Sequence, residues 1–352
     1  MSAKNPLLSI GVLAHNERLN IETTLHSLFT QDIFQRFSTE IIIVANGCTD
    51  ETAALAKRCL SDHHATWSIL GSARVEELVV AGKANAWNQF VHSLSSPRAS
   101  KLILMDADIT LLKENTISSM VTTLEQNPDA VICVDRPVKD IELKTKRSLF
   151  ENLLVTATPE IDPDNVPLCG QLYCILSAEA RLIELPFDIP VEDGFLLALL
   201  LTCGFTRPIN SRRIILDSSA AHSFTSVATL RELFKHEKWI VSSSIISMLL
   251  YERFWKECAT DCSAMKLMKH WHEQDSEWLP HYIQRQVQER GWRLLPRSWW
   301  TRRWTRLRTL SVGEILRRIP VAAIATIIDI LVFIAAIGDV RQGRAFRYWG
   351  RK

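Results

Sequence analysis

The chain has 352 residues, of which 47% are hydrophobic and 23% are charged, and its formal net charge is +2 at pH 7. These fractions are ordinary for globular proteins, so they exclude a disordered, collagen-like or low-complexity chain and indicate a sizeable buried core. The eight cysteines lack the spacing of a metal finger and no secretory signal precedes them, so we expect reduced thiols in the cytosol.

The first 210 residues alternate between strand and helix patterns. Short apolar runs, which are typical of buried strands, occur at 7–14, 40–47, 101–108 and 130–135. Helical spacing begins at Ile21, and further helices are expected at 52–60 and 116–124. Strands that are apolar throughout and alternate with helices predict an α/β fold with a mainly parallel sheet and helices on both faces. In such a sheet, ligands bind at the carboxyl ends of the strands.

Two short segments lie just ahead of predicted helices. Asn46-Gly47 is typical of a chain reversal, and Asp50 can cap the helix that follows. Gly82-Lys83 could set a cation and a backbone amide against a phosphate group. Each segment is equally well explained as an ordinary turn.

Two aspartates, Asp106 and Asp108, follow the apolar run KLILM, where an α/β sheet presents its ligands. Two neighbouring carboxylates repel each other, which favours a cation near them. Their hard oxygen atoms suit Mg²⁺ or Mn²⁺, which would also neutralise a bound diphosphate. By itself the triplet is weak support for a metal site, because an Asp at a strand end often caps the next helix.

Glu192 and Asp193 stand at the start of the helical pattern FLLALLLTCGF. Acids at this position stabilise the first turn through the helix dipole. A carboxylate in a dry cleft, whose pKa is raised by burial and by a like-charged neighbour, is also the usual form of a general base. The residues alone leave both interpretations open. His222, in contrast, is expected to be a core or surface residue rather than a ligand.

Beyond about residue 225 the pattern becomes helical, and nine of the eleven Trp lie at or after Trp239. Residues 285–352 contain fifteen Lys/Arg and four Asp/Glu, a net charge of +11, which leaves −9 for residues 1–284. Nucleic acid and an anionic membrane surface are the two partners that suit such a polycation.

Residues 319–338 contain one charge, Asp329, and eleven Ile, Leu, Val or Phe. A helix of this length extends about 30 Å, the thickness of a hydrocarbon core. The central acid makes insertion marginal and arginines flank both ends, so a spanning helix and a helix lying in the membrane both stay open. The Trp- and Arg-rich segment 293–308 is typical of a membrane interface. We therefore expect membrane association and no nucleic acid, with a packed terminal helix of a soluble protein as the alternative.

In this order, the motifs resemble those of the inverting, metal-dependent GT-A glycosyltransferases of family 2, from about residue 8 to about residue 207. The matching segments are SIGVLAHNE, EIIIVANGCTDETA, AGKANAWNQ, LILMDAD and CGQLYCILSAEARLIELPFDIPVEDGFLLALLLTCGF. The resemblance implies a Rossmann-like GT-A fold, a nucleotide-sugar donor that carries UDP or GDP, and Mg²⁺ or Mn²⁺ as cofactor.

The same resemblance implies a role for each motif. The donor would contact His15, Asn16, Glu17, Asn46, Lys83 and Asp106, and the metal ion would bind Asp106 and Asp108. Asp193 would deprotonate the acceptor hydroxyl, with Glu192 shaping its surroundings, and the oxygen would attack the anomeric carbon and invert it. The metal and Lys83 would stabilise the charge on the leaving diphosphate.

Two departures from the family pattern matter. Many members have an acid at the position of Ala45 that contacts the donor base, so the resemblance leaves the base open. Processive polysaccharide synthases of the family have Gln-X-X-Arg-Trp after the Glu-Asp pair, whereas the nearest stretch here, 235–239, keeps a cation and the Trp. This favours transfer of a single sugar, although Trp239 is equally well explained as a core residue of an amphipathic helix.

The sequence thus predicts a hexosyltransferase for cell envelope polysaccharide, acting on a lipid-linked or glycan acceptor at the cytosolic face of an inner or plasma membrane. It predicts a catalytic domain at 1–224, accessory helices at 225–290 and a basic membrane-associating segment at 291–352. A non-catalytic membrane-anchored subunit that binds nucleotide sugars is one alternative. A sugar nucleotidyltransferase is another, but it would need a Gly-rich loop after the first strand, where the chain has GVLAHNE.

Overall fold

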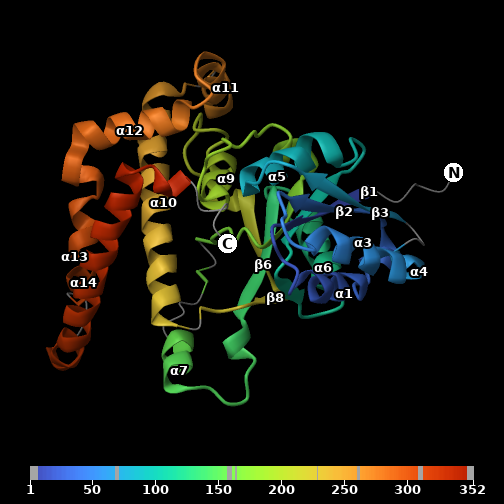
Figure 1. The fold of residues 1–352 in the computed structure, drawn as a ribbon, viewed down its shortest axis with the longest axis horizontal. Helices are drawn as coiled ribbons and strands as arrows, with labels where there is room; N and C mark the ends of the chain where they lie inside the picture. The colour runs from blue at the N-terminus through green and yellow to red at the C-terminus, as the bar shows by residue number, and fades with distance from the viewer. Residues whose placement is uncertain are drawn as a thin grey trace. The chain divides into compact units, whose positions relative to one another are not determined.

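The computed structural model describes residues 7–67, 71–156, 161–162, 165–227, 229–259, 262–307 and 312–346. The chain divides into two units, one made of Met1–Ser226 with Cys258–Met268 and the other of Val227–Glu257 with Lys269–Arg351 (Figure 1). The second unit therefore contains helices from both the 225–290 segment and the 291–352 segment.

The first unit is built on one sheet, to which the described residues contribute eight strands in the order β3-β2-β1-β4-β7-β6-β8-β5. The strands are β1 (Leu7–Ala14), β2 (Ser38–Asn46), β3 (Gly71–Leu78), β4 (Lys101–Asp106), β5 (Ile109–Leu111), β6 (Ile132–Lys139), β7 (Leu172–Leu176) and β8 (Ile214–Phe224). The four apolar runs of the sequence correspond to β1, β2, β4 and β6, so these strand predictions are confirmed. The run that ends in Asp106 is the fourth strand rather than the third, because the sequence pattern did not show β3.

The expectation of a mainly parallel sheet is only half right. Strands β3, β2, β1 and β4 are parallel to one another, and β6 is parallel to β8. Strand β7 runs antiparallel to both of its neighbours, β4 and β6, and β5 runs antiparallel to β8. The sheet is therefore mixed, with one wholly parallel half.

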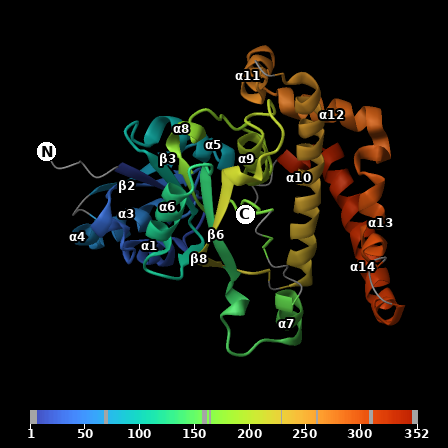
Figure 2. The ribbon, with the colours of Figure 1, turned by 180° about the vertical axis from the view of Figure 1, so that it is seen from behind.

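Helices cover both faces of this sheet, as expected (Figures 1 and 2). The main helices of the unit are α1 (Ile21–Phe29), α3 (Thr52–Asp62), α5 (Lys83–Gln89), α6 (Thr116–Gln126), α7 (Leu149–Thr156) and α9 (Glu192–Leu201), and the short ones are α2 (Ile33–Arg36), α4 (His64–Trp67) and α8 (Ser177–Ala180). Side chains of α1, α3 and α6 share one core with alternate residues of β1, β2 and β4. On the opposite face a π-helical turn, Phe90–Leu94, follows α5 and reaches β1 at Gly11, where an added Cβ would lie 2.7 Å from the ring of Phe90.

The parallel half of the sheet places several chain turns at one edge. Strands β1 and β2 are in register up to Ala14 and Ala45, and Leu13 of β1 pairs with Asp106 of β4. The turns after β1, β2 and β4 therefore leave the sheet side by side. These turns carry the residues that the sequence singled out.

The second unit is helical. Its main helices are α10 (Leu230–Glu257), α12 (Trp278–Arg290), α13 (Arg297–Leu307) and α14 (Val312–Arg341), and α11 (Ala264–Gln274) begins in the first unit and ends in the second. Helix α14 packs against α10, α12 and α13. The hydrophobic segment 319–338 is thus helical, as expected. Among the residues that the structure describes, no helix has both the length and the apolar character needed to cross a membrane.

Candidate active site

The turn after β1 is fastened to the turn after β2. His15 Nδ1 lies 2.7 Å from the carbonyl oxygen of Asn46, and the backbone N–H of Thr49 donates to Asn16 Oδ1 at 2.8 Å. Asn16 has a φ of 55°, in the left-handed region that Asn tolerates better than most residues. The backbone N–H of Glu17 donates to Thr52 Oγ1 at 2.8 Å, at the start of α3. The two turns form one polar floor at the carboxyl edge of the sheet.

Asn46 links this floor to the segment before α5. Its Nδ2 donates to the carbonyl oxygen of Gly82 at 2.9 Å. Its Oδ1 is buried, and within the described part of the chain no donor reaches it. A buried acceptor without a donor is costly, which marks this atom as a place where a ligand N–H would be stabilised.

Lys83, the first residue of α5, connects two of the predicted motifs. Its Nζ lies 2.8 Å from Asp106 Oδ2 and 3.0 Å from Glu192 Oε1, and it donates to the carbonyl oxygen of Gly170 at 3.3 Å. Burial alone would lower the pKa of Lys83, but the charges of Asp106 and Glu192 raise it well above its usual value. A buried cation therefore joins the acid that ends β4 to the acid that begins α9.

The acids after β4 suit a divalent cation. Burial raises the pKa of Asp106 to about 7 against the opposing effect of Lys83, and the charge of Asp108 adds to the rise. Asp108 is half-buried, and its carboxylate makes no hydrogen bond or ion pair with another residue of the described ranges. Those ranges contain no cluster of three or more His, Cys, Asp or Glu placed to hold a metal. Mg²⁺ is often held by one or two carboxylates together with substrate phosphates, and Asp106 and Asp108 fit that use.

Asp193 lies in the first turn of α9, next to Glu192. Its Oδ2 accepts a hydrogen bond from the backbone N–H of Gly170 at 3.2 Å, and its Oδ1 accepts one from the backbone N–H of Gly194 at 2.6 Å. Burial and the charge of Glu192 raise the pKa of Asp193 to about 6, while Lys83 opposes the rise. The carboxylate is thus oriented by two backbone donors and is poised to exchange a proton near neutral pH.

The backbone of Gly170 and Gln171 contacts Lys83, Asp106 and Asp193; these two residues belong to the matching segment CGQLYC, but the sequence did not predict their contacts. Gly170 contacts Lys83 and Asp193, and the carbonyl oxygen of Gln171 accepts from the backbone N–H of Asp106 at 2.8 Å. A Cβ at position 170 would lie 2.9 Å from Asp193 Cβ and 3.1 Å from Glu192 Oε1, so this approach requires glycine.

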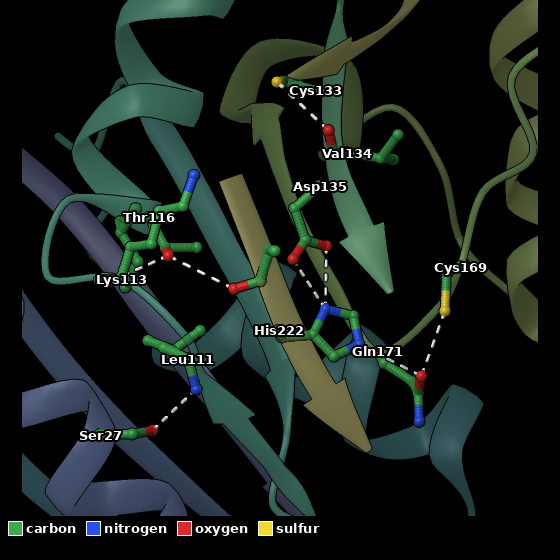
Figure 3. A network of polar contacts seen from close by, with 12 residues as sticks. Ser27, Leu111, Lys113, Thr116, Cys133, Val134, Asp135, Cys169, Gln171 and His222 are labelled. Carbon is green, nitrogen blue, oxygen red and sulfur yellow. Dashed lines mark hydrogen bonds and ion pairs between the residues drawn. The ribbon is translucent and has the colours of Figure 1, made fainter. Parts of the chain in front are cut away.

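A buried pair, Asp135 and His222, lies next to the side chain of Gln171 in this segment (Figure 3). His222 Nδ1 lies 2.8 Å from Asp135 Oδ2, and both side chains are fully buried. His222 Nε2 lies 3.3 Å from Gln171 Oε1, to which the Cys169 thiol also donates at 3.3 Å. Burial raises the pKa of Cys169 to about 12, so this thiol remains a donor at neutral pH.

His222 is a core residue, as the sequence predicted, but it is a polar one with a specific partner. Asp135 was not singled out, and it lies at a break in register of β6, between Val134 and Arg136. The two residues are 87 positions apart. Since β6 and β8 are neighbours only in the folded sheet, no local spacing could have paired them.

The structure gathers the predicted site residues into two connected groups. The first contains His15, Asn16, Glu17 and Asn46, and the second contains Lys83, Asp106, Asp108, Glu192 and Asp193. Asn46 joins them through Gly82. The carboxylate of Glu17 accepts from Asn20 Nδ2 at 2.8 Å, so it is engaged at the start of α1.

The comparisons with known proteins point to glycosyl transferases. Residues 9–180 match the family model described as glycosyl transferase family 2. No curated protein sequence matches the chain.

Among solved structures, the mannosyltransferase PcManGT from Pyrobaculum calidifontis, in complex with GDP-Man and Mn²⁺, aligns with 100% of this chain and 89% of its own at 16% identity and a TM-score of 0.55. TarS 1–349 from S. aureus, in complex with UDP, aligns over 96% and 91% at 15% identity and a TM-score of 0.46. Glucosyl-3-phosphoglycerate synthase from Mycobacterium tuberculosis, in complex with Mn²⁺, UDP and phosphoglyceric acid, aligns over 69% and 78% at 18% identity and a TM-score of 0.47. The first of these supports the fold. Residues 9–180 are thus similar to glycosyl transferase family 2, and the sheet and helices of the chain form a GT-A-like α/β fold.

Proposed function

We propose that this chain is a metal-dependent inverting glycosyltransferase that moves a single hexose from a UDP- or GDP-linked donor to a lipid-linked or glycan acceptor. The observation that carries the proposal is the position of Lys83, whose ammonium group joins Asp106 to Glu192. It brings a donor-binding acid and the Glu-Asp pair to one place at the carboxyl edge of the sheet.

The donor would occupy the polar floor formed by the turns after β1 and β2. The buried Oδ1 of Asn46 would accept a hydrogen bond from an N–H of the nucleotide, which uracil and guanine both offer. His15 and Asn16 orient this floor through their contacts with the turn after β2. The P. calidifontis mannosyltransferase is in complex with GDP-Man, which supports a nucleotide-sugar donor of this kind.

Asp106 and Asp108 would hold Mg²⁺ or Mn²⁺. When bound, the ion supplies positive charge to the donor diphosphate and to the nucleoside diphosphate that leaves. Lys83 adds a fixed charge of the same sign beside Asp106, in a buried place where electrostatic stabilisation is strong.

Asp193 would act as the general base. As the acceptor oxygen attacks the anomeric carbon, its proton passes to Asp193, a new carbon–oxygen bond forms, and the bond from the anomeric carbon to the diphosphate oxygen breaks. Attack from the face opposite to the leaving group inverts the configuration. The backbone N–H groups of Gly170 and Gly194 hold the carboxylate in one orientation during this transfer.

The surroundings of Gly82 support an acceptor with an apolar portion. The Phe187 ring is about half exposed and would lie 3.7 Å from a Cβ at Gly82, while Val79 and Val80 are exposed on the same loop as Gly82. Large apolar side chains at the rim of a charged site suit a substrate that presents a hydroxyl or phosphate on a lipid chain. The net charge of +11 on residues 285–352 supports placing this acceptor at the anionic cytosolic face of an inner or plasma membrane.

The decisive experiment compares Asp193→Asn with the wild-type enzyme and with Asp129→Asn, an exposed control of the same chemistry. A thermal-shift panel of UDP- and GDP-sugars, with and without Mn²⁺, first identifies the donor, because a ligand that binds the native state raises its melting temperature. Transfer from that donor is then measured. We expect Asp193→Asn to keep the donor-induced shift and lose transfer by about a thousandfold or more.

Undiminished transfer by Asp193→Asn would rule out the base assignment. Donor binding without transfer in the wild-type enzyme, over a panel of polyprenyl phosphates, glycolipids and saccharides, would instead favour a non-catalytic subunit that binds nucleotide sugars.

A further inference from the structure

Helix α14 is apolar on two opposite sides. One side packs within its own unit, and its buried apolar members in the described ranges are Ala322, Val332, Phe333, Ala336, Ile337 and Val340. The other side carries Ile327, Ile328, Ile330, Leu331 and Ile334, which are between 37% and 60% exposed. These five residues are called the apolar ridge here. A surface helix of a soluble protein normally places polar residues where this ridge lies.

The packed side of α14 is fixed by charge as well as by apolar contact. Asp329 receives paired hydrogen bonds from the guanidinium groups of Arg302 and Arg303 on α13, at 2.8–3.0 Å. The rings of Trp299 and Trp300 lie 6.1 and 5.2 Å from that of Phe333. The single acid of the hydrophobic segment therefore faces protein and is neutralised there. In the described part of α14, the ridge side is thus the one that can meet an external apolar phase.

We infer that the apolar ridge of α14 docks into the surface of a bilayer that contains anionic lipids, with the helix lying in the plane of the membrane. This inference goes beyond glycosyl transfer and does not depend on it. It chooses an in-plane helix over the spanning helix that the sequence left open, because the side of α14 bearing Asp329 is already covered by α13.

Charge favours a membrane over a second copy of the chain. Residues 285–352 carry a net charge of +11, so these segments of two copies would repel each other. Anionic lipid headgroups attract the same cations. Trp304 on α13 is 41% exposed, and tryptophan is enriched at the depth of the headgroups.

The ridge is also small for a protein interface. From Ile327 to Ile334 it extends only about 10 Å along the helix. A strip of this length is too short to provide the area of about 800 Å² that a stable interface buries on each partner. A bilayer needs no complementary shape, and a short row of aliphatic side chains flanked by cations is typical of helices that lie in a membrane interface.

The test uses the full-length protein and two paired variants. Ile327→Gln/Leu331→Gln removes two members of the ridge, and Leu182→Gln/Ile209→Gln removes two exposed aliphatic side chains of the first unit as a matched control. All four positions are exposed, so neither variant should unfold. Flotation is measured with vesicles of phosphatidylcholine alone and with vesicles that also contain phosphatidylglycerol, at low and high salt.

We expect the wild-type protein and the control to float with the phosphatidylglycerol vesicles at low salt, and less so at high salt. The ridge variant should bind them about tenfold more weakly. Equal flotation of the two variants, or no flotation of the wild-type protein, would overturn the inference. A wild-type dimer that the ridge variant loses, seen by light scattering without lipid, would instead assign the ridge to a second copy. Donor-binding and transfer assays in detergent test the proposed function separately, so failure of one proposal leaves the other intact.

Discussion

Gly170 lies against Asp193 so closely that the two residues act as one structural element. The backbone N–H of Gly170 donates to Asp193 Oδ2 at 3.2 Å, and an added Cβ would lie 2.9 Å from Asp193 Cβ. Asp193 Cβ is bonded directly to the backbone of α9, so it cannot move aside to make room as the end of a long, flexible side chain could.

Gly170→Ala should therefore move the carboxylate of Asp193 and lower kcat by about tenfold to a hundredfold. Gly194→Ala is the matched control, since a Cβ there meets nothing closer than Val191 Cγ1 at 3.7 Å and the helix gains propensity. Steady-state kinetics of the two variants, with melting temperatures, check the prediction. Equal losses in both variants would show that Asp193 tolerates displacement.

The raised pKa of Asp193 predicts how the reaction depends on pH. A base with a pKa of about 6 is ionised at pH 7 and becomes protonated below pH 6, so kcat should fall about tenfold per pH unit on the acid side of that value. A pH–rate profile under donor saturation measures this limb. An acid limb centred near pH 4 would mean that burial does not shift this carboxyl during turnover.

The same rise in pKa means that the ionised Asp193 destabilises the folded state. Its pKa rises from 3.8 in the unfolded chain to about 6 in the folded one, so the folded state binds more protons between these values and stability falls as pH rises through them. Asp193→Asn should thus raise the free energy of unfolding by about 1–3 kcal/mol at pH 7.5 and abolish transfer. Urea unfolding at pH 7.5 and pH 4 checks the sign, because the gain should shrink at the lower pH.

Asp108 is predicted to matter for the metal and little for the fold. Because its carboxylate has no partner in the described part of the chain, Asp108→Asn should change the melting temperature of the metal-free protein little. It should weaken the Mn²⁺-dependent thermal shift with donor by about tenfold or more in apparent metal affinity. Chelation of divalent ions should abolish transfer by the wild-type enzyme. A variant that keeps the wild-type response to Mn²⁺ would exclude Asp108 as a ligand.

The buried pair of Asp135 and His222 should be essential to the order of residues 169–171. His222→Gln leaves the fully buried side chain of Asp135 without its hydrogen-bond partner, which we expect to cost about 1–3 kcal/mol of stability. The double variant Asp135→Asn/His222→Gln should recover part of this loss. If the pair positions Gln171 and through it Asp106, both variants should also have a lower kcat per folded molecule. Unchanged kcat in the double variant would restrict the pair to a role in stability.

Asp329 should anchor α14 to α13. Burial alone would raise its pKa, but hydrogen bonds from Arg302 and Arg303 lower it below 3.8. Its contribution is therefore present above pH 3.8 and is lost as pH falls through the lowered value. Asp329→Asn should destabilise the second unit by about 1–2 kcal/mol at pH 7, since the arginines are one-third exposed. Tryptophan fluorescence in urea, at pH 7 and pH 3, should show a larger difference at pH 7 than at pH 3.

The apolar strands could be predicted from the sequence, whereas the mixed character of the sheet could not. Strand β2 is buried along nearly its whole length, so its Ile-rich run identified it. Strand β3 lies at the edge of the sheet and contains Arg74, Glu76 and Glu77, which conceal its period. Strand β7 has five residues, and nothing in them tells which way they run beside β4. Direction depends on contacts between distant segments.

The site divides in the same way. Lys83 and Asp193 lie at the starts of predicted helices and Asp106 lies at the end of a predicted strand. Their motifs could therefore be assigned to one site from the sequence. Gly170 and Gln171 lie in the matching segment CGQLYC, but they contact Lys83, Asp106 and Asp193 through backbone atoms, so no side-chain pattern could predict these contacts. The helical nature of 319–338 was predictable, but the pairing of Asp329 with arginines on α13 arose from tertiary packing.

The backbone of Gly170 and Gln171 contacts Lys83, Asp106 and Asp193 at once. A shift of this stretch of backbone would thus displace all three residues together. If the proposed function holds, substrate preference and catalytic rate should accordingly evolve in step. Attempts to re-engineer the donor pocket by altering this stretch should lose turnover before they gain a new sugar.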